Sequence, residues 1–150
     1  MKRCISIITL MLLTGWMSAQ SPTRIFVPGT KCSFDRKEGF NLAKRFNGFE
    51  NEKEKAAVMV SVLNNSLEAN IKAFSREEMK KRGMTFISYS EPELSGLKTV
   101  LYEFTQLNRE VIYRKYILIF GDSSKTFMIN SGAPDSIKSL CEIVKAITLS

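Results

Sequence analysis

The sequence predicts an α+β fold in which helices cover an antiparallel sheet. An apolar, β-rich run at residues 56–63 is typical of a central strand. From Met84 to Asn130 apolar and polar residues alternate with a period of two, and only short turn signals interrupt the alternation. Such short connections join antiparallel strands and leave no room for parallel crossovers. We therefore expect an antiparallel meander flanked by helices, and a doubly wound nucleotide-binding sheet is excluded.

The first 20 residues have the order of a secretory signal peptide. A basic pair at positions 2 and 3 precedes an apolar run from Ile5 to Leu13, and cleavage is expected between Ala19 and Ser21. The run is too short to cross a membrane core about 30 Å thick, which takes roughly 20 helical residues. We therefore expect a signal peptide at 1–20 and one exported domain at 21–150, periplasmic or extracellular, with no transmembrane segment.

The mature chain is expected to begin with two short strands. The segments Arg24 to Val27 and Lys31 to Phe34 flank the turn residues Pro28-Gly29. Residues 38–54 mix glycines and charges with aromatic side chains. This mixture predicts an ordered loop whose aromatic side chains pin it to the core.

A helical stretch is predicted between residues 64 and 82. Asn64-Asn65-Ser66 offers N-capping side chains, and Ser75 begins a second capping box, so the stretch divides into two helices if Ser75 is a joint. Gly83 ends the stretch. The basic cluster at 80–82 lies in the last turn, where cations oppose the helix dipole, and this explains the cluster without a ligand.

The meander and a closing helix complete the predicted fold. Its strands are expected at 85–90, 97–105, 111–120 and 125–130. Pro134, after Ser131-Gly132-Ala133, fits the first turn of a last helix. In that helix apolar residues recur at intervals of three and four, at Ile137, Leu140, Cys141, Val144 and Ile147. The spacing predicts an amphipathic helix lying on the sheet.

The chain contains no histidine. This excludes serine–histidine and cysteine–histidine nucleophile pairs, histidine-ligated zinc and imidazole acid–base steps. The chain also lacks the glycine pattern of a phosphate-binding loop and the spaced acidic residues of a calcium loop. We therefore expect no enzymatic activity, no cofactor and no metal site; a carboxylate-based hydrolase is the remaining catalytic alternative.

The net charge of the chain is +7, from 22 basic and 15 acidic residues. Loss of residues 1–20 removes two basic residues and no acidic one, which leaves +5. The basic residues are dispersed, and an exported protein rarely meets nucleic acid, so a nucleic-acid partner is not expected. The function that the excess positive charge suits best is binding to an anionic membrane or wall-polymer surface.

Two cysteines remain in the mature chain, and two interpretations of them stay open. Cys32 and Cys141 lie in a compartment that permits disulfides, where a bridge would close a loop of over 100 residues. Alternatively each is a small buried side chain, because Cys141 falls on the apolar stripe of the last helix.

One strand places cations and aromatic rings side by side. Tyr113, Arg114, Lys115 and Tyr116 present them on both faces, a composition that suits a partner surface or a sugar. Aromatic residues along the chain either fill the core, which is favoured, or line an apolar pocket between sheet and helices. They are Phe40, Phe46, Phe49, Phe86, Tyr89, Tyr102, Phe104, Tyr113, Tyr116 and Phe120.

The order of these elements resembles the PsbP-like and DcrB-like α/β/α sandwich family. Local cues add to the order: Glu38-Gly39-Phe40, the helix end at Lys81-Arg82-Gly83-Met84, and Ser131-Gly132-Ala133 before the closing helix. The resemblance implies a sandwich without a catalytic motif and an accessory or binding role in the bacterial cell envelope. Cys4 precedes the apolar run, so the chain lacks the lipid-bearing cysteine of the lipoprotein members.

The function predicted from the sequence is therefore a non-enzymatic exported accessory or binding protein of the bacterial cell envelope. Its expected partner is an envelope protein or a wall or membrane surface. The alternative is a carrier or sensor of an apolar small ligand in the periplasm.

Overall fold

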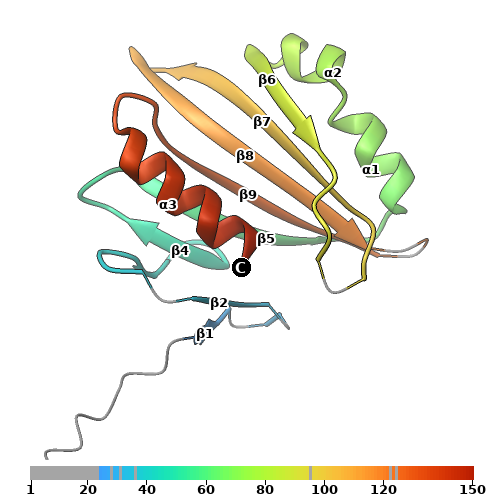
Figure 1. Ribbon diagram of the computed structural model, residues 1–150, viewed down its shortest axis with the longest axis horizontal. Helices are drawn as coiled ribbons and strands as arrows, with labels where there is room; N and C mark the ends of the chain where they lie inside the picture. Colours follow the sequence, from blue (N-terminus) through green and yellow to red (C-terminus); the bar gives the residue numbers. More distant parts are fainter. Residues whose placement is uncertain are drawn as a thin grey trace, which may run out of the picture.

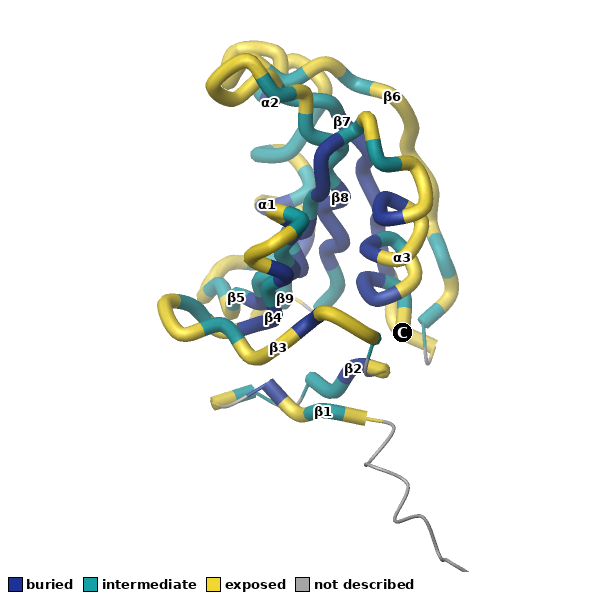
Figure 2. Tube along the Cα trace, turned by 90° about the vertical axis from the view of Figure 1, so that its left-hand side faces the viewer, coloured by how far each residue is buried: buried dark blue, intermediate teal, exposed yellow. Residues whose placement is uncertain are grey.

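The computed structural model describes residues 24–27, 29–30, 32–35, 37–94, 96–121, 123 and 125–150. The predicted signal peptide lies outside these residues. In the described part of the chain, a seven-stranded sheet has helix α3 on one face and helices α1 and α2 on the other (Figures 1 and 2). A separate two-stranded ribbon lies beside the C-terminal end of α3. The predicted α+β sandwich is confirmed.

The sheet is antiparallel throughout, with the order β3-β4-β5-β9-β8-β7-β6. The last four strands pair in succession, so the meander is confirmed. In chain order the elements are β1 (Arg24–Phe26), β2 (Ser33–Asp35), β3 (Asn41–Leu42), β4 (Gly48–Asn51), β5 (Ala56–Leu63), α1 (Leu67–Ala73), α2 (Arg76–Lys81), β6 (Met84–Ser90), β7 (Thr99–Asn108), β8 (Val111–Gly121), β9 (Thr126–Pro134) and α3 (Lys138–Leu149).

The two helices between β5 and β6 meet at Ser75, as the capping residues predict. The Ser66 hydroxyl accepts a hydrogen bond from the backbone N–H of Ala69 at 3.3 Å. The Ser75 hydroxyl accepts one from Glu78 at 3.5 Å. Each serine satisfies an N–H that a helix start leaves without a partner, so the chain begins a new helix at each of them.

The prediction that residues 38–54 form a loop is wrong. They contain β3 and β4, which extend the sheet beyond β5. Gly48 has a φ of 149°, and a Cβ there would collide with the carbonyl oxygen of Val58 on the neighbouring strand. A glycine that permits so close an approach interrupts the alternation by which strands are recognised, although Phe49 is buried as expected.

The expected start of the last helix is also wrong. Ser131, Gly132 and Ala133 continue β9, and Pro134 is its last residue, paired with Tyr113 of β8. The helix begins only at Lys138. The long partner strand β8 extends the pairing, and Pro134 is tolerated because it ends the strand.

The core has two parts, one on each face of the sheet. Between the sheet and α3 lie, among others, Val58, Val60, Leu101, Tyr116, Leu118, Ile129, Leu140, Cys141, Val144 and Ile147. Beneath α1 and α2 lie Leu67, Met79, Val100, Tyr102, Phe104, Ile117 and Ile119. The alternation predicted along β7 and the apolar stripe predicted for the last helix are both confirmed. Within the described residues no helix has the length and apolar character that a membrane span needs.

Candidate functional site

Helices α1 and α2 leave part of their face of the sheet uncovered. Along β8 the residues on this face change from Ile119 and Ile117, which are buried, to Lys115 and Tyr113, which are not. The residues on this face change in the same way along the two neighbouring strands. In β7 the change is from Phe104 to Gln106 and Asn108. In β9 it is from Met128 to Asn130 and Gly132. The boundary between apolar and polar residues therefore runs diagonally across the three strands, because Phe104 pairs with Lys115 and Ile117 pairs with Asn130.

The uncovered region is hollowed, with a volume of about 310 Å³. We name it the open face. Its lining residues are Phe46, Lys55, Ala57, Met59, Gln106, Asn108, Tyr113, Lys115, Asn130, Ser131 and Gly132. Two of these residues are lysines and none is acidic, so the open face is cationic.

Lys115 is the central charged group of the open face. Its side chain lies over Gly132 on the neighbouring strand. A Cβ built at that glycine would lie 3.6 Å from Lys115 Cγ and 3.5 Å from Lys115 Cε. Burial lowers the pKa of Lys115, and no hydrogen bond or ion pair joins its Nζ to another residue of the described chain. The site therefore holds a partly desolvated ammonium group without a counter-charge.

Replacing Lys115 with methionine should stabilise the protein. Lys115→Met keeps the length of the side chain and removes a charge that the fold desolvates, so we expect a gain of roughly 0.5–2 kcal/mol in the free energy of unfolding. Urea denaturation of wild type and variant at pH 7 measures this gain.

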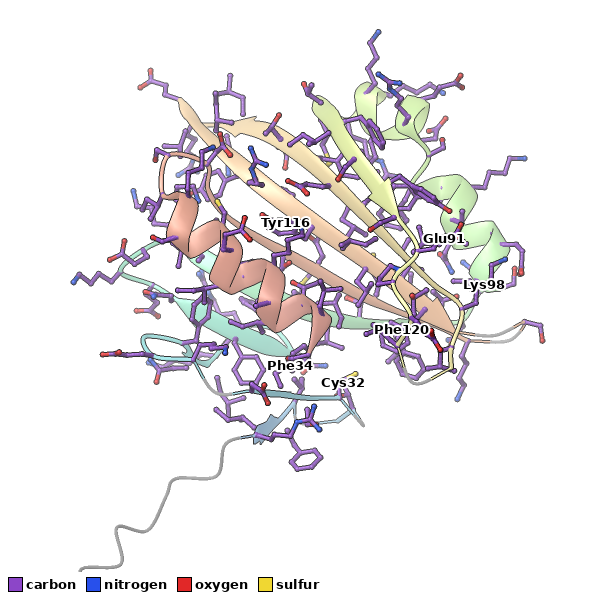
Figure 3. The ribbon with its side chains drawn as sticks, viewed as in Figure 1. Cys32, Phe34, Glu91, Lys98, Tyr116 and Phe120 are labelled. Atoms are coloured by element: carbon purple, nitrogen blue, oxygen red, sulfur yellow. The ribbon has the colours of Figure 1, made fainter. Side chains whose placement is uncertain are left out.

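The gain should shrink with rising pH. A lysine whose folded-state pKa lies below 10.5 binds fewer protons in the folded than in the unfolded state, so wild-type stability rises as pH climbs toward 10.5. The control is Lys98→Met, an exposed lysine just before β7 (Figure 3), for which we expect a change within about 0.5 kcal/mol. A Lys115→Met protein less stable than wild type contradicts the account.

The four residues predicted as a partner surface do not form one surface. Tyr113 and Lys115 line the open face, whereas Arg114 and Tyr116 point to the opposite side, toward α3. Tyr116 is buried there (Figure 3), with the ammonium group of Lys145 over its ring at 5.8 Å, and burial raises the pKa of its hydroxyl.

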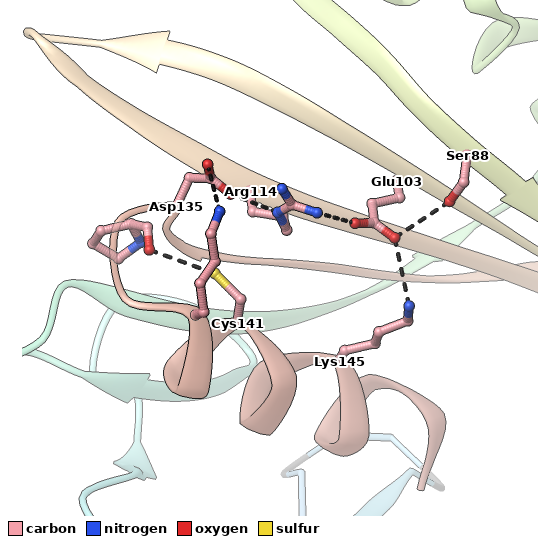
Figure 4. Close-up of polar contacts among 8 residues, drawn as sticks. Ser88, Glu103, Arg114, Asp135, Cys141 and Lys145 are labelled. Atoms are coloured by element: carbon pink, nitrogen blue, oxygen red, sulfur yellow. Dashed lines mark hydrogen bonds and ion pairs between the residues drawn. The ribbon is translucent and has the colours of Figure 1, made fainter.

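Arg114 belongs to an ion-pair cluster that joins the sheet to α3 (Figure 4). Its Nη1 lies 2.6 Å from Glu103 Oε1, and its Nε lies 2.6 Å from Asp135 Oδ1. Lys145 of α3 approaches Glu103 at 3.5 Å, and Lys138 approaches Asp135 at 2.9 Å. Hydrogen bonds from Lys138 and Arg114 lower the pKa of Asp135. Because each carboxylate is already paired, this cluster is structural.

Cys32 and Cys141 are both free thiols in the structure. Cys141 donates to the Pro134 carbonyl at 3.5 Å near the start of α3, whereas Cys32 lies in a hollow beside Leu149 at its end. Burial raises the pKa of each thiol, so neither is an activated nucleophile.

Two other hollows lie on the α3 side of the molecule. The larger, about 730 Å³, is lined by charged residues of the β3–β4 region, most of them exposed, with both signs present. The second, about 250 Å³, is bounded by the β1–β2 ribbon, the end of α3 and residues 94 and 97. Its walls include Phe34, Leu118 and Phe120, and of the predicted aromatic residues only Phe120 lines it. Within the described chain no group of three or more metal-ligating side chains gathers.

Sequence reasoning found Tyr113 and Lys115 and listed Phe46 among the aromatic residues of the core or a pocket, but it missed the polar residues of the open face. Gln106, Asn108 and Asn130 were not singled out, because each is an ordinary polar residue near a strand end. The signal is a boundary between apolar and polar side chains that runs diagonally across three neighbouring strands. It becomes visible only once the strands are aligned by their pairing.

Comparisons with known proteins show the fold. No family model and no curated protein matches the chain. Among solved structures, LpqN of Mycobacterium tuberculosis, involved in cell envelope biogenesis, matches with a TM-score of 0.57 at 10% identity, over 77% of this chain and 78% of LpqN. The chain therefore shares its fold with LpqN. The cyanobacterial PsbP of Synechocystis sp. PCC 6803 matches with a TM-score of 0.44 at 13% identity, over 77% of this chain and 84% of that protein.

Proposed function

We propose that this protein is an exported, non-enzymatic accessory protein of the bacterial cell envelope that binds its partner through the open face. The observation that carries the proposal is the unpaired Lys115 in a hollow without acidic residues. A desolvated charge without a partner destabilises the folded protein, and such a group is typical of binding sites.

Export and the envelope are supported by two separate observations. Residues 1–20 have the composition of a signal peptide. The structurally similar LpqN is involved in cell envelope biogenesis. The first concerns the destination of this chain, and the second concerns a protein that shares its fold.

The chemistry of the open face favours binding over catalysis. A lysine with a lowered pKa also serves as the nucleophile in Schiff-base enzymes. Such reactions need groups that transfer protons to and from the intermediates. Apart from Lys115 itself, the lining offers only the Tyr113 hydroxyl and the exposed Lys55, and it contains no carboxylate.

Export and envelope retention test the proposal. The full chain, expressed with a C-terminal tag in a bacterium, should accumulate outside the cytoplasm with a mass that begins near Ser21. The purified mature protein should then bind isolated envelopes, and Lys115→Met should weaken that binding at least about tenfold while Lys98→Met leaves it unchanged. Retention of residues 1–20 contradicts export, and equal binding by the two variants contradicts the open face as the site.

The apolar walls of the 250 Å³ hollow, which include Phe34, Leu118 and Phe120, favour the second candidate function, a carrier of an apolar ligand. Its volume lies just below the usual range of ligand pockets, roughly 300–1,000 Å³. This function predicts that a medium-chain fatty acid such as decanoate raises the melting temperature of wild type and Lys115→Met equally. The open-face proposal predicts no such rise.

A further inference from the structure

The open face combines two cations, three side-chain amides and two aromatic rings in a hollow of limited size. From this combination we propose that its ligand is a sugar acid of one pyranose unit, bound with its carboxylate on Lys115. The inference rests on the proposed use of the open face as a binding site, and it names the chemical class that the site takes.

The charge of the ligand follows from Lys115. Its ammonium group is partly desolvated and has no acidic neighbour in the lining, and Lys55 adds a second positive charge at the rim. A carboxylate brought to this group gains a charge-assisted hydrogen bond and removes the penalty of the unpaired charge. No arginine lines the hollow, so the two-pronged geometry that favours phosphate recognition is absent from it.

The amides indicate that the rest of the ligand is polar. Gln106, Asn108 and Asn130 each carry donors and an acceptor, and none of these side chains is hydrogen-bonded to another described residue. Hydroxyl groups, which both donate and accept, complement such a set. A purely apolar acid would cover the half-buried amides of Gln106 and Asn130 without offering them partners and is therefore disfavoured.

The size and the rings narrow the choice to a single sugar unit. A volume of about 310 Å³ holds roughly ten water molecules, which is the scale of one pyranose ring with its substituents. Phe46 and Tyr113 line the hollow and offer apolar ring surface to the C–H groups of such a ring. A folded protein partner would need a far larger interface, of roughly 1,200 Å² or more.

Titration of the purified mature protein with glucuronate, followed by two-dimensional ¹H–¹⁵N NMR, tests the inference. We expect the backbone signals of Lys115, Asn130 and Gly132 to shift with a millimolar dissociation constant. Glucose, which lacks the carboxylate, should bind at least about tenfold more weakly. Lys115→Met, which we expect to be more stable than wild type, should bind glucuronate no better than glucose, and Lys98→Met should bind it like wild type.

Three results overturn the inference: glucuronate shifts that lie elsewhere in the molecule, equal affinity for glucose and glucuronate, or tighter binding of glucose 6-phosphate than of glucuronate. These outcomes are separable from a failure of the proposed function. If envelopes still require Lys115 while glucuronate does not bind, the site stands and the ligand class is wrong. If neither envelopes nor glucuronate depend on Lys115, both are wrong.

Discussion

Replacing Arg114 with methionine should lower the free energy of unfolding by roughly 3 kcal/mol, at the lower end of the range for breaking a buried ion pair. The side chain of Glu103 is only 8% exposed and loses its closest cation, leaving Lys145 at 3.5 Å. Asp135 keeps Lys138. Chemical denaturation of wild type and variant at pH 7 measures the loss.

A second variant shows whether the loss comes from the carboxylate left behind. In Arg114→Met/Glu103→Leu both members of the buried pair become apolar, and we expect part of the lost stability to return. A double variant less stable than Arg114→Met would contradict this account. The open face lies on the other side of the sheet, so glucuronate binding should persist in any Arg114 variant that folds.

Replacing Phe104 with alanine should lower the free energy of unfolding by about 3–5 kcal/mol. Phe104 is fully buried beneath α1 and α2, where its ring meets Phe86 edge-on at 5.8 Å and stacks with Tyr102 at 5.9 Å. Truncation removes these contacts and leaves a cavity, since the sheet backbone on one side and Met79 on the other limit collapse.

Leu107→Ala is the matched control, because Leu107 lies on the same strand and is 67% exposed. We expect it to change stability by no more than about 0.5 kcal/mol. Thermal and urea unfolding of both variants provide the comparison. A Phe104→Ala loss below about 1 kcal/mol would mean that the helical layer packs on the sheet less tightly than described.

Local patterns predicted most of the secondary structure because their signals act over a few residues. Residues 56–63 form β5 over the whole predicted range, since an uninterrupted apolar run needs no distant partner to be recognised. Ser66 and Ser75 each begin a helix through a hydrogen bond to an N–H three residues later.

Two boundaries could not be predicted because distant strands set them. β4 exists because Gly48 lets the chain pass close to Val58, and this approach leaves no periodic pattern in residues 38–54. β9 continues to Pro134 because Tyr113 of β8 is there to pair with it. A glycine or a proline read locally indicates a turn, whereas strand pairing decides whether the sheet continues.

The candidate site was likewise determined partly by local sequence and partly by contacts between distant elements. The sequence by itself determined that β8 carries Tyr113, Arg114, Lys115 and Tyr116, and the period of two placed alternate residues on opposite faces. Only the tertiary structure decided which face is covered. α3 buries Tyr116, and Glu103 and Asp135 pair with Arg114 on the same side of the sheet, whereas Lys115 lies outside the buried cluster beneath α1 and α2. The physical reason is that burial and ion pairing depend on elements far away in the chain, whereas side-chain alternation depends only on the strand itself.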